Sequence, residues 1–225
     1  MSKKVLVGDI KEAGAISRLA PSSFPGRTRA FIRIQDGCDS SCAYCVVPSV
    51  RGKSRSMPLE NAGTQIKRLA AAGHLETVLS GIHLGMYGKD LMPALTLADL
   101  LRFLDEHSPI RRIRLSSIEP QEISQEIVDL LAGSEAFCPH LHIPLQSGDD
   151  EILAAMNRNY DSGFFAELAG RLFRSIPGLA MGTDIIVGFP GETEKNFENT
   201  VDLVNSIPFS YLHVFPYSDR PGTAA

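Results

Sequence analysis

Three of the four cysteines in this 225-residue chain fall in one stretch, Asp36-Gly37-Cys38-Asp39-Ser40-Ser41-Cys42-Ala43-Tyr44-Cys45. Their spacing is C-x3-C-x2-C, and the remaining cysteine, Cys138, stands far along the chain. Thiolates are the usual ligands of iron–sulfur clusters, which normally take four protein ligands. Three cysteines without a clear fourth partner therefore predict a cluster with one iron left open. A structural zinc site is the alternative, but it needs four closed ligands, which only distant residues could complete.

The composition is that of a globular protein, with 44% hydrophobic residues and a formal net charge of −4. This charge argues against a chain that binds nucleic acid through an overall basic surface. No apolar run is long enough to span a bilayer, and the N-terminus lacks the apolar core of a signal peptide. Clustered cysteines are not a disulfide framework, so a reducing, cytoplasmic setting is expected.

Strand and helix patterns alternate from residue 28 onward, whereas residues 1–26 show weak periodicity and are predicted to be a linker. Strands are expected at 30–34, 76–79, 112–115, 140–145, 180–187 and 211–215. Helices are expected at 58–72, 97–106, 124–131, 150–156, 164–175 and 193–205, the last with Phe197, Val201 and Val204 on one apolar face. This alternation favours parallel βαβ units. The pattern alone leaves open a doubly wound sheet or a barrel with about six of the usual eight units.

Polar and glycine-rich stretches follow each expected strand. Both architectures bind ligands at the carboxyl ends of their parallel strands. The cysteine stretch follows the first strand, and the later strands are followed by Ser80-Gly81-Ile82-His83, Ser116-Ser117-Ile118-Glu119, Gln146-Ser147-Gly148, Gly188-Phe189-Pro190-Gly191-Glu192 and Pro216-Tyr217-Ser218. The sequence therefore predicts one site at this end of the sheet.

The segment Cys38-x3-Cys42-x-Tyr44-Cys45 resembles the signature of the radical S-adenosylmethionine enzymes. The resemblance implies a partial (β/α)6 TIM-like barrel and a [4Fe–4S] cluster held by the three cysteines. S-adenosylmethionine would bind the open iron and be cleaved to a 5′-deoxyadenosyl radical. No catalytic residue beyond the cluster ligands is implied. The cofactor contacts that the resemblance suggests are Tyr44, Ser80, Gly81, Glu119, Gln146, Ser147, Gly188, Glu192 and Tyr217. Ser80-Gly81-Ile82 departs from the usual Gly-Gly-Glu, so backbone carbonyls would replace a carboxylate there.

Longer motifs resemble one branch of this superfamily, the methylthiotransferases, over residues 27–225. They are Arg51-Gly52-Lys53-Ser54-Arg55, His142-Ile143-Pro144-Leu145-Gln146-Ser147-Gly148, Met156-Asn157-Arg158-x-Tyr160, Gly182-Thr183-Asp184-Ile185-Ile186-Val187-Gly188-Phe189-Pro190-Gly191-Glu192 and Phe215-Pro216-Tyr217-Ser218-x-Arg220. The stretch 80–88 is most similar to the branch that acts on N6-threonylcarbamoyladenosine at position 37 of tRNA. The implied reaction converts C2–H to C2–SCH3, with tRNA and an electron donor such as flavodoxin as partners. Alternatives are isopentenyladenosine tRNA, a ribosomal-protein aspartate, or a non-catalytic zinc-binding α/β scaffold.

The resemblance also sets an expectation about domains. Members of the family carry an N-terminal domain with a second cluster and a C-terminal RNA-binding domain. We expect residues 1–26 to be a remnant before the core, residues 27–225 to be the core domain, and both flanking domains to be absent. An acidic core without a basic platform would bind tRNA weakly, since affinity depends on neutralised phosphates. Candidate RNA contacts are Arg51, Lys53, Arg55, Arg158 and Arg220, with ordinary solvated charge as the alternative.

Overall fold

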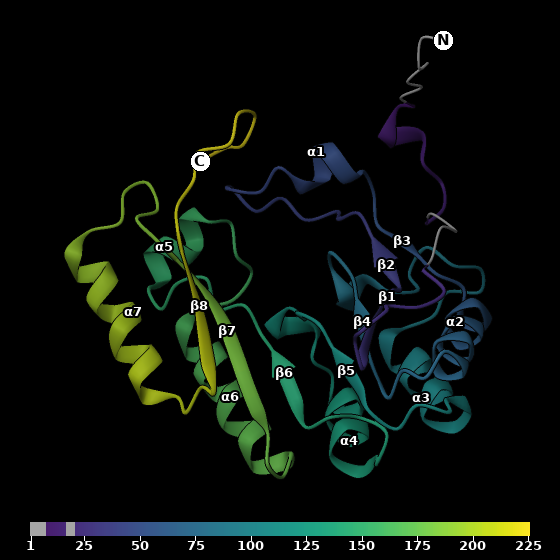
Figure 1. The fold of residues 1–225 in the computed structure, drawn as a ribbon. Helices are drawn as coiled ribbons and strands as arrows, with labels where there is room; N and C mark the ends of the chain where they lie inside the picture. The colour runs from purple at the N-terminus through teal and green to yellow at the C-terminus, as the bar shows by residue number, and fades with distance from the viewer. Residues whose placement is uncertain (1–7, 17–20) are drawn as a thin grey trace.

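Six parallel strands form an open arc in the computed structural model, which describes residues 8–16 and 21–225 (Figure 1). The strands are β1 (Arg29–Arg33), β4 (Glu76–Ser80), β5 (Ile113–Leu115), β6 (His140–His142), β7 (Ala180–Val187) and β8 (Tyr211–Pro216). They pair in the orders β1-β4-β5 and β6-β7-β8, and bridges such as Ser117–His142 join β5 to β6. Because β1 and β8 do not pair, the barrel is partial, and the predicted six-unit fold is confirmed.

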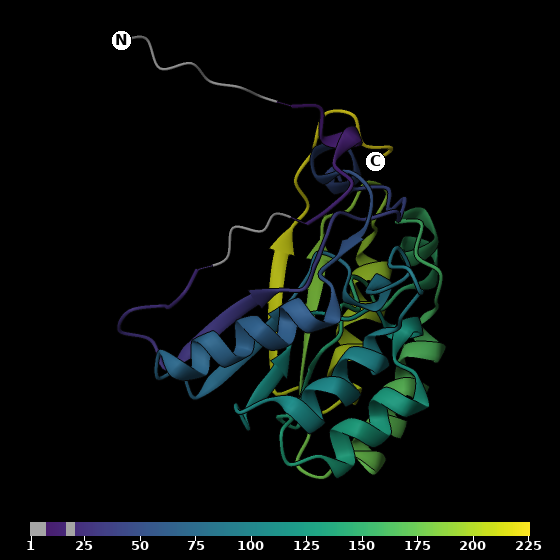
Figure 2. The same ribbon diagram turned by 90° about the vertical axis from the view of Figure 1, so that its right-hand side faces the viewer.

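Helices cover the outer side of this arc and leave the inner side free (Figure 2). They are α2 (Leu59–Ala71), α3 (Leu97–His107), α4 (Gln125–Gly133), α5 (Asp150–Ala155), α6 (Ser162–Ser175) and α7 (Glu194–Ser206). Side-chain caps begin five of them, for example Thr96, whose hydroxyl accepts from the Asp99 amide and whose own amide donates to the Asp99 carboxylate. Each helix matches a segment that the apolar spacing predicted.

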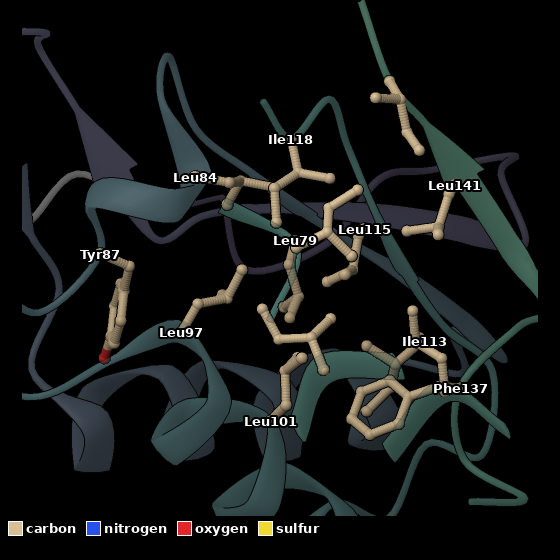
Figure 3. Close-up of a cluster of buried hydrophobic side chains, with 14 of the residues drawn as sticks. Leu79, Leu84, Tyr87, Leu97, Leu101, Ile113, Leu115, Ile118, Phe137 and Leu141 are labelled. Atoms are coloured by element: carbon tan, nitrogen blue, oxygen red, sulfur yellow. The ribbon is translucent and has the colours of Figure 1, made fainter. Parts of the chain in front are cut away.

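The hydrophobic core lies between the strands and the helices (Figure 3). In β1, Ala30 and Ile32 are fully buried against the helices, and the alternate side chain Phe31 is 40% exposed on the inner face. Leu79 and Leu101 meet in the same core from β4 and α3. Burying each leucine or isoleucine is worth roughly 1.5–3 kcal/mol. This alternation leaves the inner face of the arc, hereafter the lumen, free for polar side chains.

One helix faces the core differently from the prediction. The apolar stripe expected on α7 is partly exposed, since Phe197 and Val201 are each 39% accessible. The buried positions are instead Asn196 and Thr200. The Thr200 hydroxyl accepts a hydrogen bond from the Gly148 amide at 2.9 Å, so α7 is fixed to the loop after β6 by polar contacts.

Short elements that the sequence did not predict surround the cysteine stretch. A two-residue antiparallel pair, β2 (Gln35–Asp36) and β3 (Arg55–Ser56), closes the ends of its loop. Between them lies α1 (Val47–Arg51), and three 3-10 turns occur elsewhere: η1 (Ile10–Glu12), η2 (Leu84–Met86) and η3 (Pro120–Glu122). These elements are too short for periodicity to reveal them.

The described part of the predicted linker packs on the core. Ile16 is 7% exposed, and the Phe24 ring contacts the rings of Phe31 and His74 at centroid distances of 6.1 and 5.9 Å. Residues 1–7 and 17–20 of that prediction lie outside the described residues. Among the helices that the structure describes, none combines the length and apolar character needed to cross a membrane.

Candidate functional site

The cysteine loop folds tightly onto the turn that follows it. Gly37 has a φ of 76°, and a Cβ there would collide with the Lys53 carbonyl oxygen. The Cys38 amide donates to the Gly52 carbonyl at 3.0 Å. From the other side, the Arg55 guanidinium donates to the carbonyl oxygens of Lys53 and Arg51 at 2.8 and 2.9 Å. The loop is thus held at its base by glycine geometry and one buried arginine.

All three clustered cysteines are half-buried and line one cavity of about 210 Å³ at the carboxyl ends of the strands. Its lining residues are Cys38, Ser40, Cys42, Tyr44, Cys45, Val47, Ile82, His83, Ser117, Ile118, Glu119, Pro144, Gln146, Arg158 and Asp184. Cys138 lies elsewhere, buried at 6% exposure, with its amide bonded to the Ile113 carbonyl.

The spacing of the three sulfur atoms fits a cluster better than a single ion. Thiolates on one zinc, each about 2.3 Å from the metal, lie about 3.8 Å apart. Among the described residues, the three cysteine sulfurs do not all lie within 4.8 Å of one another. In an iron–sulfur cluster each thiolate binds a different iron, which allows wider separation. The donor set therefore fits three-cysteine cluster ligation.

Residues after α5 hold the cysteine loop from the opposite half of the barrel. The Ala43 amide donates to the Met156 carbonyl at 2.9 Å, and the Asn157 side chain donates to the Ser41 carbonyl at 2.8 Å. Arg158 Nη1 lies 3.2 Å from Cys42 Sγ. Asn157 has a positive φ of 58°, which turns the chain so that both neighbouring contacts form.

Arg158 also pairs with Glu119, which follows β5. The guanidinium contacts the Glu119 carboxylate directly, and the two side chains are 5% and 21% exposed. Arg158 Nε donates to the Tyr160 hydroxyl at 3.2 Å. Burial alone would lower the pKa of Arg158, but surrounding groups, Glu119 among them, raise it, so the guanidinium stays charged beside Cys42.

His83, after β4, is a site residue that sequence reasoning did not select. Its Nδ1 lies 3.4 Å from Cys38 Sγ, and its Nε2 lies 2.7 Å from a Glu122 carboxylate oxygen. Burial opposes protonation, but contacts with Cys38 and Glu122 raise the pKa of His83 to about 10. In turn His83 lowers the pKa of Cys38 despite burial, which favours the thiolate that a metal requires. Its position at a strand end was the available sequence signal.

The predicted cofactor contacts divide into two groups. Tyr44, Glu119 and Gln146 line the cavity. Tyr44 packs in a small apolar cluster with Tyr217, which meets the Phe189 ring edge-on at a centroid distance of 5.5 Å. Of these aromatic residues, Tyr44 lines the cavity, and Tyr217 and Phe189 pack beside it.

The other predicted contacts lie apart from the cavity lining. Ser80 ends β4 and donates to the Ile32 carbonyl at 3.2 Å, and Gly81 packs against Gln35. Gly188 is an exposed turn glycine with a φ of 74°, and its amide donates to the Glu192 carboxylate. Ser147 stays a predicted contact, although its side chain is fully buried and contacts the Thr200 hydroxyl at 3.2 Å.

The basic residues proposed for RNA contact fall into an exposed group and a buried group. Arg51, Lys53 and Arg220 are exposed. An RNA-facing role stays a prediction for Arg55 and Arg158, whose side chains are buried and already bonded within the site. Arg55 donates to the carbonyl oxygens of Lys53 and Arg51. Arg158 contacts the Glu119 carboxylate and the Cys42 sulfur.

Part of the stretch 80–88, on which the substrate prediction rested, is structural: Leu84, Tyr87 and Gly88 are buried, and its other six residues are half-buried or exposed. The Tyr87 side chain is fully buried and donates to the Met57 carbonyl at 2.8 Å, and the Gly88 amide donates to Ser56 Oγ at 2.8 Å. Only Ile82 and His83 of this stretch line the cavity.

Comparison with known families agrees with this geometry. The family model described as the Radical SAM superfamily matches residues 32–204, which include all three clustered cysteines and run from the end of β1 into α7. This chain belongs to the radical SAM superfamily. Membership confirms the predicted fold class and the predicted cofactor pair of a [4Fe–4S] cluster and S-adenosylmethionine.

Curated relatives of this radical SAM chain are methylthiotransferases by name. Threonylcarbamoyladenosine tRNA methylthiotransferase MtaB of Rickettsia prowazekii is 43% identical, covering 99% of this chain and 53% of its own length. MtaB of Bacillus subtilis is 44% identical, covering 97% and 49%. The tRNA-2-methylthio-N(6)-dimethylallyladenosine synthase of Clostridium botulinum strain Loch Maree is 41% identical, covering 88% and 44%. The chain thus spans about half the length of these relatives.

Solved structures share the fold at low sequence identity. The radical S-adenosylmethionine methyltransferase TsrM from Kitasatospora setae, with cobalamin and a [4Fe–4S] cluster bound, matches with a TM-score of 0.73 at 21% identity, covering 87% of this chain and 35% of TsrM. Coproporphyrinogen III oxidase HemN from Escherichia coli matches with a TM-score of 0.60 at 20% identity, covering 86% and 44%.

Proposed function

We propose that this chain is the catalytic core of a tRNA methylthiotransferase that acts on N6-threonylcarbamoyladenosine at position 37. The observation that carries the proposal is one cavity with three cysteine thiols, in a chain 43% identical over 224 residues to an enzyme named for that substrate. The reaction replaces C2–H of the base by C2–SCH3. A tRNA substrate and free thiols together imply a cytoplasmic location, with an electron donor such as flavodoxin.

Each half of the site has a separate task in this proposal. Cys38, Cys42 and Cys45 hold the cluster, which, when bound, supplies the electron that begins radical chemistry on S-adenosylmethionine. Burial raises the pKa of Cys38, but its contact with His83 lowers it overall, and Arg158 holds Cys42 through a contact with its sulfur. Tyr44 and Gln146 line the space for the cofactor, and Tyr217 packs in the same apolar cluster as Tyr44.

A second substrate has support from one comparison. The Clostridium botulinum relative named for dimethylallyladenosine is 41% identical over 197 residues, close to the values for the threonylcarbamoyladenosine enzymes. Only Ile82 and His83 of the 80–88 stretch line the cavity, so this stretch offers few side chains that could separate the two bases. The substrate assay below therefore includes both.

The proposal extends to parts of the relatives that this chain does not match. We propose that sulfur insertion needs a second cluster outside residues 27–225, and that firm tRNA binding needs an RNA-binding domain. Arg51, Lys53 and Arg220 remain the exposed candidates for phosphate contact on the core. Neutralising Arg51 and Lys53 together should weaken RNA binding and reduce its salt dependence.

Substrate identity is tested in Bacillus subtilis lacking its MtaB. The matching half of that relative is replaced by this chain, and tRNA nucleosides are analysed by mass spectrometry. We expect 2-methylthio-N6-threonylcarbamoyladenosine to return, and a Cys42→Ser chimera to fail. A gain of methylthiolated dimethylallyladenosine alone would transfer the proposal to the second substrate. Neither product, despite a folded chimera that cleaves S-adenosylmethionine, would reject a methylthiotransferase core.

A further inference from the structure

A cluster of charged side chains lies in the lumen at the first three strands. Glu76 begins β4, and its Oε1 atom lies 2.7 Å from Arg29 Nε and 3.1 Å from Arg114 Nε. Its Oε2 atom lies 3.2 Å from Arg112 Nε. None of these four residues lines the cavity that contains the cysteines. Cluster binding by the cysteines therefore leaves this group unexplained.

Alternation along the strands places these side chains on the inner face. Successive side chains of a strand point to opposite faces of the sheet. In β1, Arg29 is followed by Ala30, and in β5, Arg114 follows Ile113; both of these apolar neighbours are fully buried in the core. Arg29 is also paired with Glu76 in the register of β1 and β4. The cluster thus faces the lumen because the neighbouring side chains face the helices.

The cluster carries more positive than negative charge. Three guanidinium groups, which stay protonated in proteins, surround one carboxylate. Each of them reaches that carboxylate through Nε. Within the described ranges 8–16 and 21–225, no Nη atom of Arg29, Arg112 or Arg114 donates a hydrogen bond to the protein. Because two donors of one guanidinium can bind a carboxylate or phosphate side by side, the cluster has the charge and the donors for a second anion.

Arg114 belongs to a strand whose carboxyl end leads to the cysteine cavity. Ser117, three residues after Arg114, lines that cavity. At about 3.3 Å per residue, the two backbone positions are about 10 Å apart. The Arg114 side chain is 19% exposed, compared with 50% for Arg29 and 61% for Arg112. A molecule in the lumen can therefore contact Arg114 while its other end lies in the cavity.

The last three strands present a carboxylate to the lumen instead. Asp184 of β7 accepts through Oδ1 from His142 Nε2 at 2.9 Å and from His213 Nδ1 at 3.1 Å, and its Oδ2 has no hydrogen-bond partner among the described residues. The Tyr211 hydroxyl lies 3.1 Å from His142 Nδ1 and 2.9 Å from His140 Nε2, which completes a hydrogen-bonded group, hereafter the lumen network. Burial opposes ionisation of Asp184, but the two imidazoles lower its pKa overall. An anion in the lumen is therefore repelled by Asp184 and attracted by the arginines.

The two candidate substrates differ in charge at N6. The threonylcarbamoyl group is a threonine joined through its amine, so it ends in a free carboxylate, whereas the dimethylallyl group is uncharged. Seven covalent bonds separate the carboxyl carbon from C2, the atom that is modified, and an extended chain of this length spans at most about 8 Å. This span is similar to the backbone distance between Ser117 and Arg114. With C2 in the cavity, the carboxylate can reach the arginines.

We propose that Arg29, Arg112 and Arg114 bind the carboxylate of the threonylcarbamoyl group and select this base over one with an uncharged N6 substituent. This inference rests on the proposed function and deepens it. Arg114 makes the strongest contact because it is the most buried of the three, and a hydrogen bond between charged groups there is worth about 10- to 100-fold in affinity. Arg29 and Arg112 contribute less, since water screens exposed charges.

The test compares two RNAs that differ only in this charge. One is an anticodon stem–loop with N6-threonylcarbamoyladenosine, and the other carries the threonine carboxylate as its neutral methylamide. Their dissociation constants are measured by fluorescence anisotropy for the Bacillus subtilis chimera described above, purified and reconstituted anaerobically. For the unchanged chimera we expect the methylamide RNA to bind about 10-fold more weakly than the charged RNA.

Arg114→Gln should remove this preference. We expect it to weaken binding of the charged RNA about 10-fold and to leave binding of the methylamide RNA unchanged, which also reports that the variant is folded. Arg29→Gln, at the exposed start of β1, keeps the Arg114–Glu76 pair and should reduce the preference to about threefold. Arg102→Gln is the matched control, because it removes the same charge from the outer helix α3 and should leave the preference intact.

Two results would overturn the inference. Equal binding of both RNAs by the unchanged chimera would show that the lumen does not distinguish the carboxylate. An equal loss for both RNAs in Arg114→Gln would make Arg114 a phosphate contact or a structural residue. The nucleoside analysis tests the proposed function separately. A chimera that forms 2-methylthio-N6-threonylcarbamoyladenosine but binds both RNAs equally rejects only this inference, whereas methylthiolated dimethylallyladenosine alone rejects the substrate and the inference with it.

Discussion

The first three strands and the last three strands present different chemistry to the same lumen. In β1, β4 and β5 the inner face carries Phe31 and a charged cluster, in which Arg29, Arg112 and Arg114 all lie within 3.2 Å of the Glu76 carboxylate. In β6, β7 and β8 the inner face carries imidazole, phenol and one carboxylate joined by hydrogen bonds. The first half neutralises its own carboxylate within one ion cluster, whereas the second half leaves a carboxylate oxygen free. The two halves therefore share the same repeated βαβ backbone. They differ in the side chains that point into the lumen.

The cysteine site joins these two halves. Its loop follows β1, but the contacts that fix Ala43 and Cys42 come from Met156 and Arg158, after α5. Glu119, after β5, then bonds Arg158. The four predictions below test which half each function depends on, in order of decreasing effect.

Removing a cluster ligand from the first half should abolish the site. Cys42→Ser is expected to lower iron from about four atoms per chain to below about one after anaerobic reconstitution. Cys138→Ala should keep its iron, since Cys138 is buried away from the cavity. Iron analysis and visible absorption measure both variants. Loss of iron from Cys138→Ala would make that residue a fourth ligand.

Breaking the pair that links the halves should cost the most stability. Arg158→Met leaves Glu119 half-buried without its partner, at an expected cost of about 3–5 kcal/mol. Urea unfolding of the cluster-free, reduced protein measures this cost. Arg102→Met is the control, because the Arg102–Glu126 pair is exposed on α3 and α4 and its loss should be undetectable. Equal effects of the two variants would contradict the bracing role of Arg158.

Removing the carboxylate from the charged cluster of the first half should lower the free energy of unfolding by a smaller amount. Glu76→Gln removes the carboxylate shared by three arginines, and we expect a loss of about 1–2 kcal/mol because Arg29 and Arg112 are half exposed. Burial opposes ionisation, but the arginines lower the pKa of Glu76 overall. Its contribution is therefore present above the unfolded-state pKa of about 4.3 and is lost as the pH falls below it. Urea unfolding at pH 7 and pH 3.5 should show a smaller difference between wild type and variant at the lower pH.

Mild acid should lower the folding stability of the second half, because His140 lies in its lumen. Burial, aided by the positive charge of Arg114, lowers the pKa of His140 from 6.5 to about 4. The unfolded chain therefore binds more protons between these values, and stability is lost as the pH falls from 6.5 to about 4. We expect His140→Gln to flatten this slope by on the order of 1 kcal/mol in thermal unfolding. His107→Gln, an exposed change on α3, should leave the slope intact.

The sequence was enough to predict the strands, the helices and a cysteine stretch whose three thiols line one cavity, because these signals are local. Apolar periodicity fixed six strands and six helices to within a few residues, and C-x3-C-x2-C stands within eight residues. The role of His83 and the burial of Arg55 and Arg158 were not predictable, since they depend on which loops meet. The lumen network was not predictable for the same reason: His140 and Tyr211 are 71 residues apart. Only the register of three strands brings them together.

The boundary between β5 and β6, hereafter the seam, affects the order in which the chain folds and binds iron. Isolated bridges such as Ser117–His142 join these strands, whereas β7 and β8 pair over six residues. Each half can gain its local pairings first, and the seam forms when the halves meet. The second half supplies the partners of Ala43 and Cys42, so the loop reaches its final shape only after that meeting. We expect iron to be captured late, by a chain whose two halves have already docked.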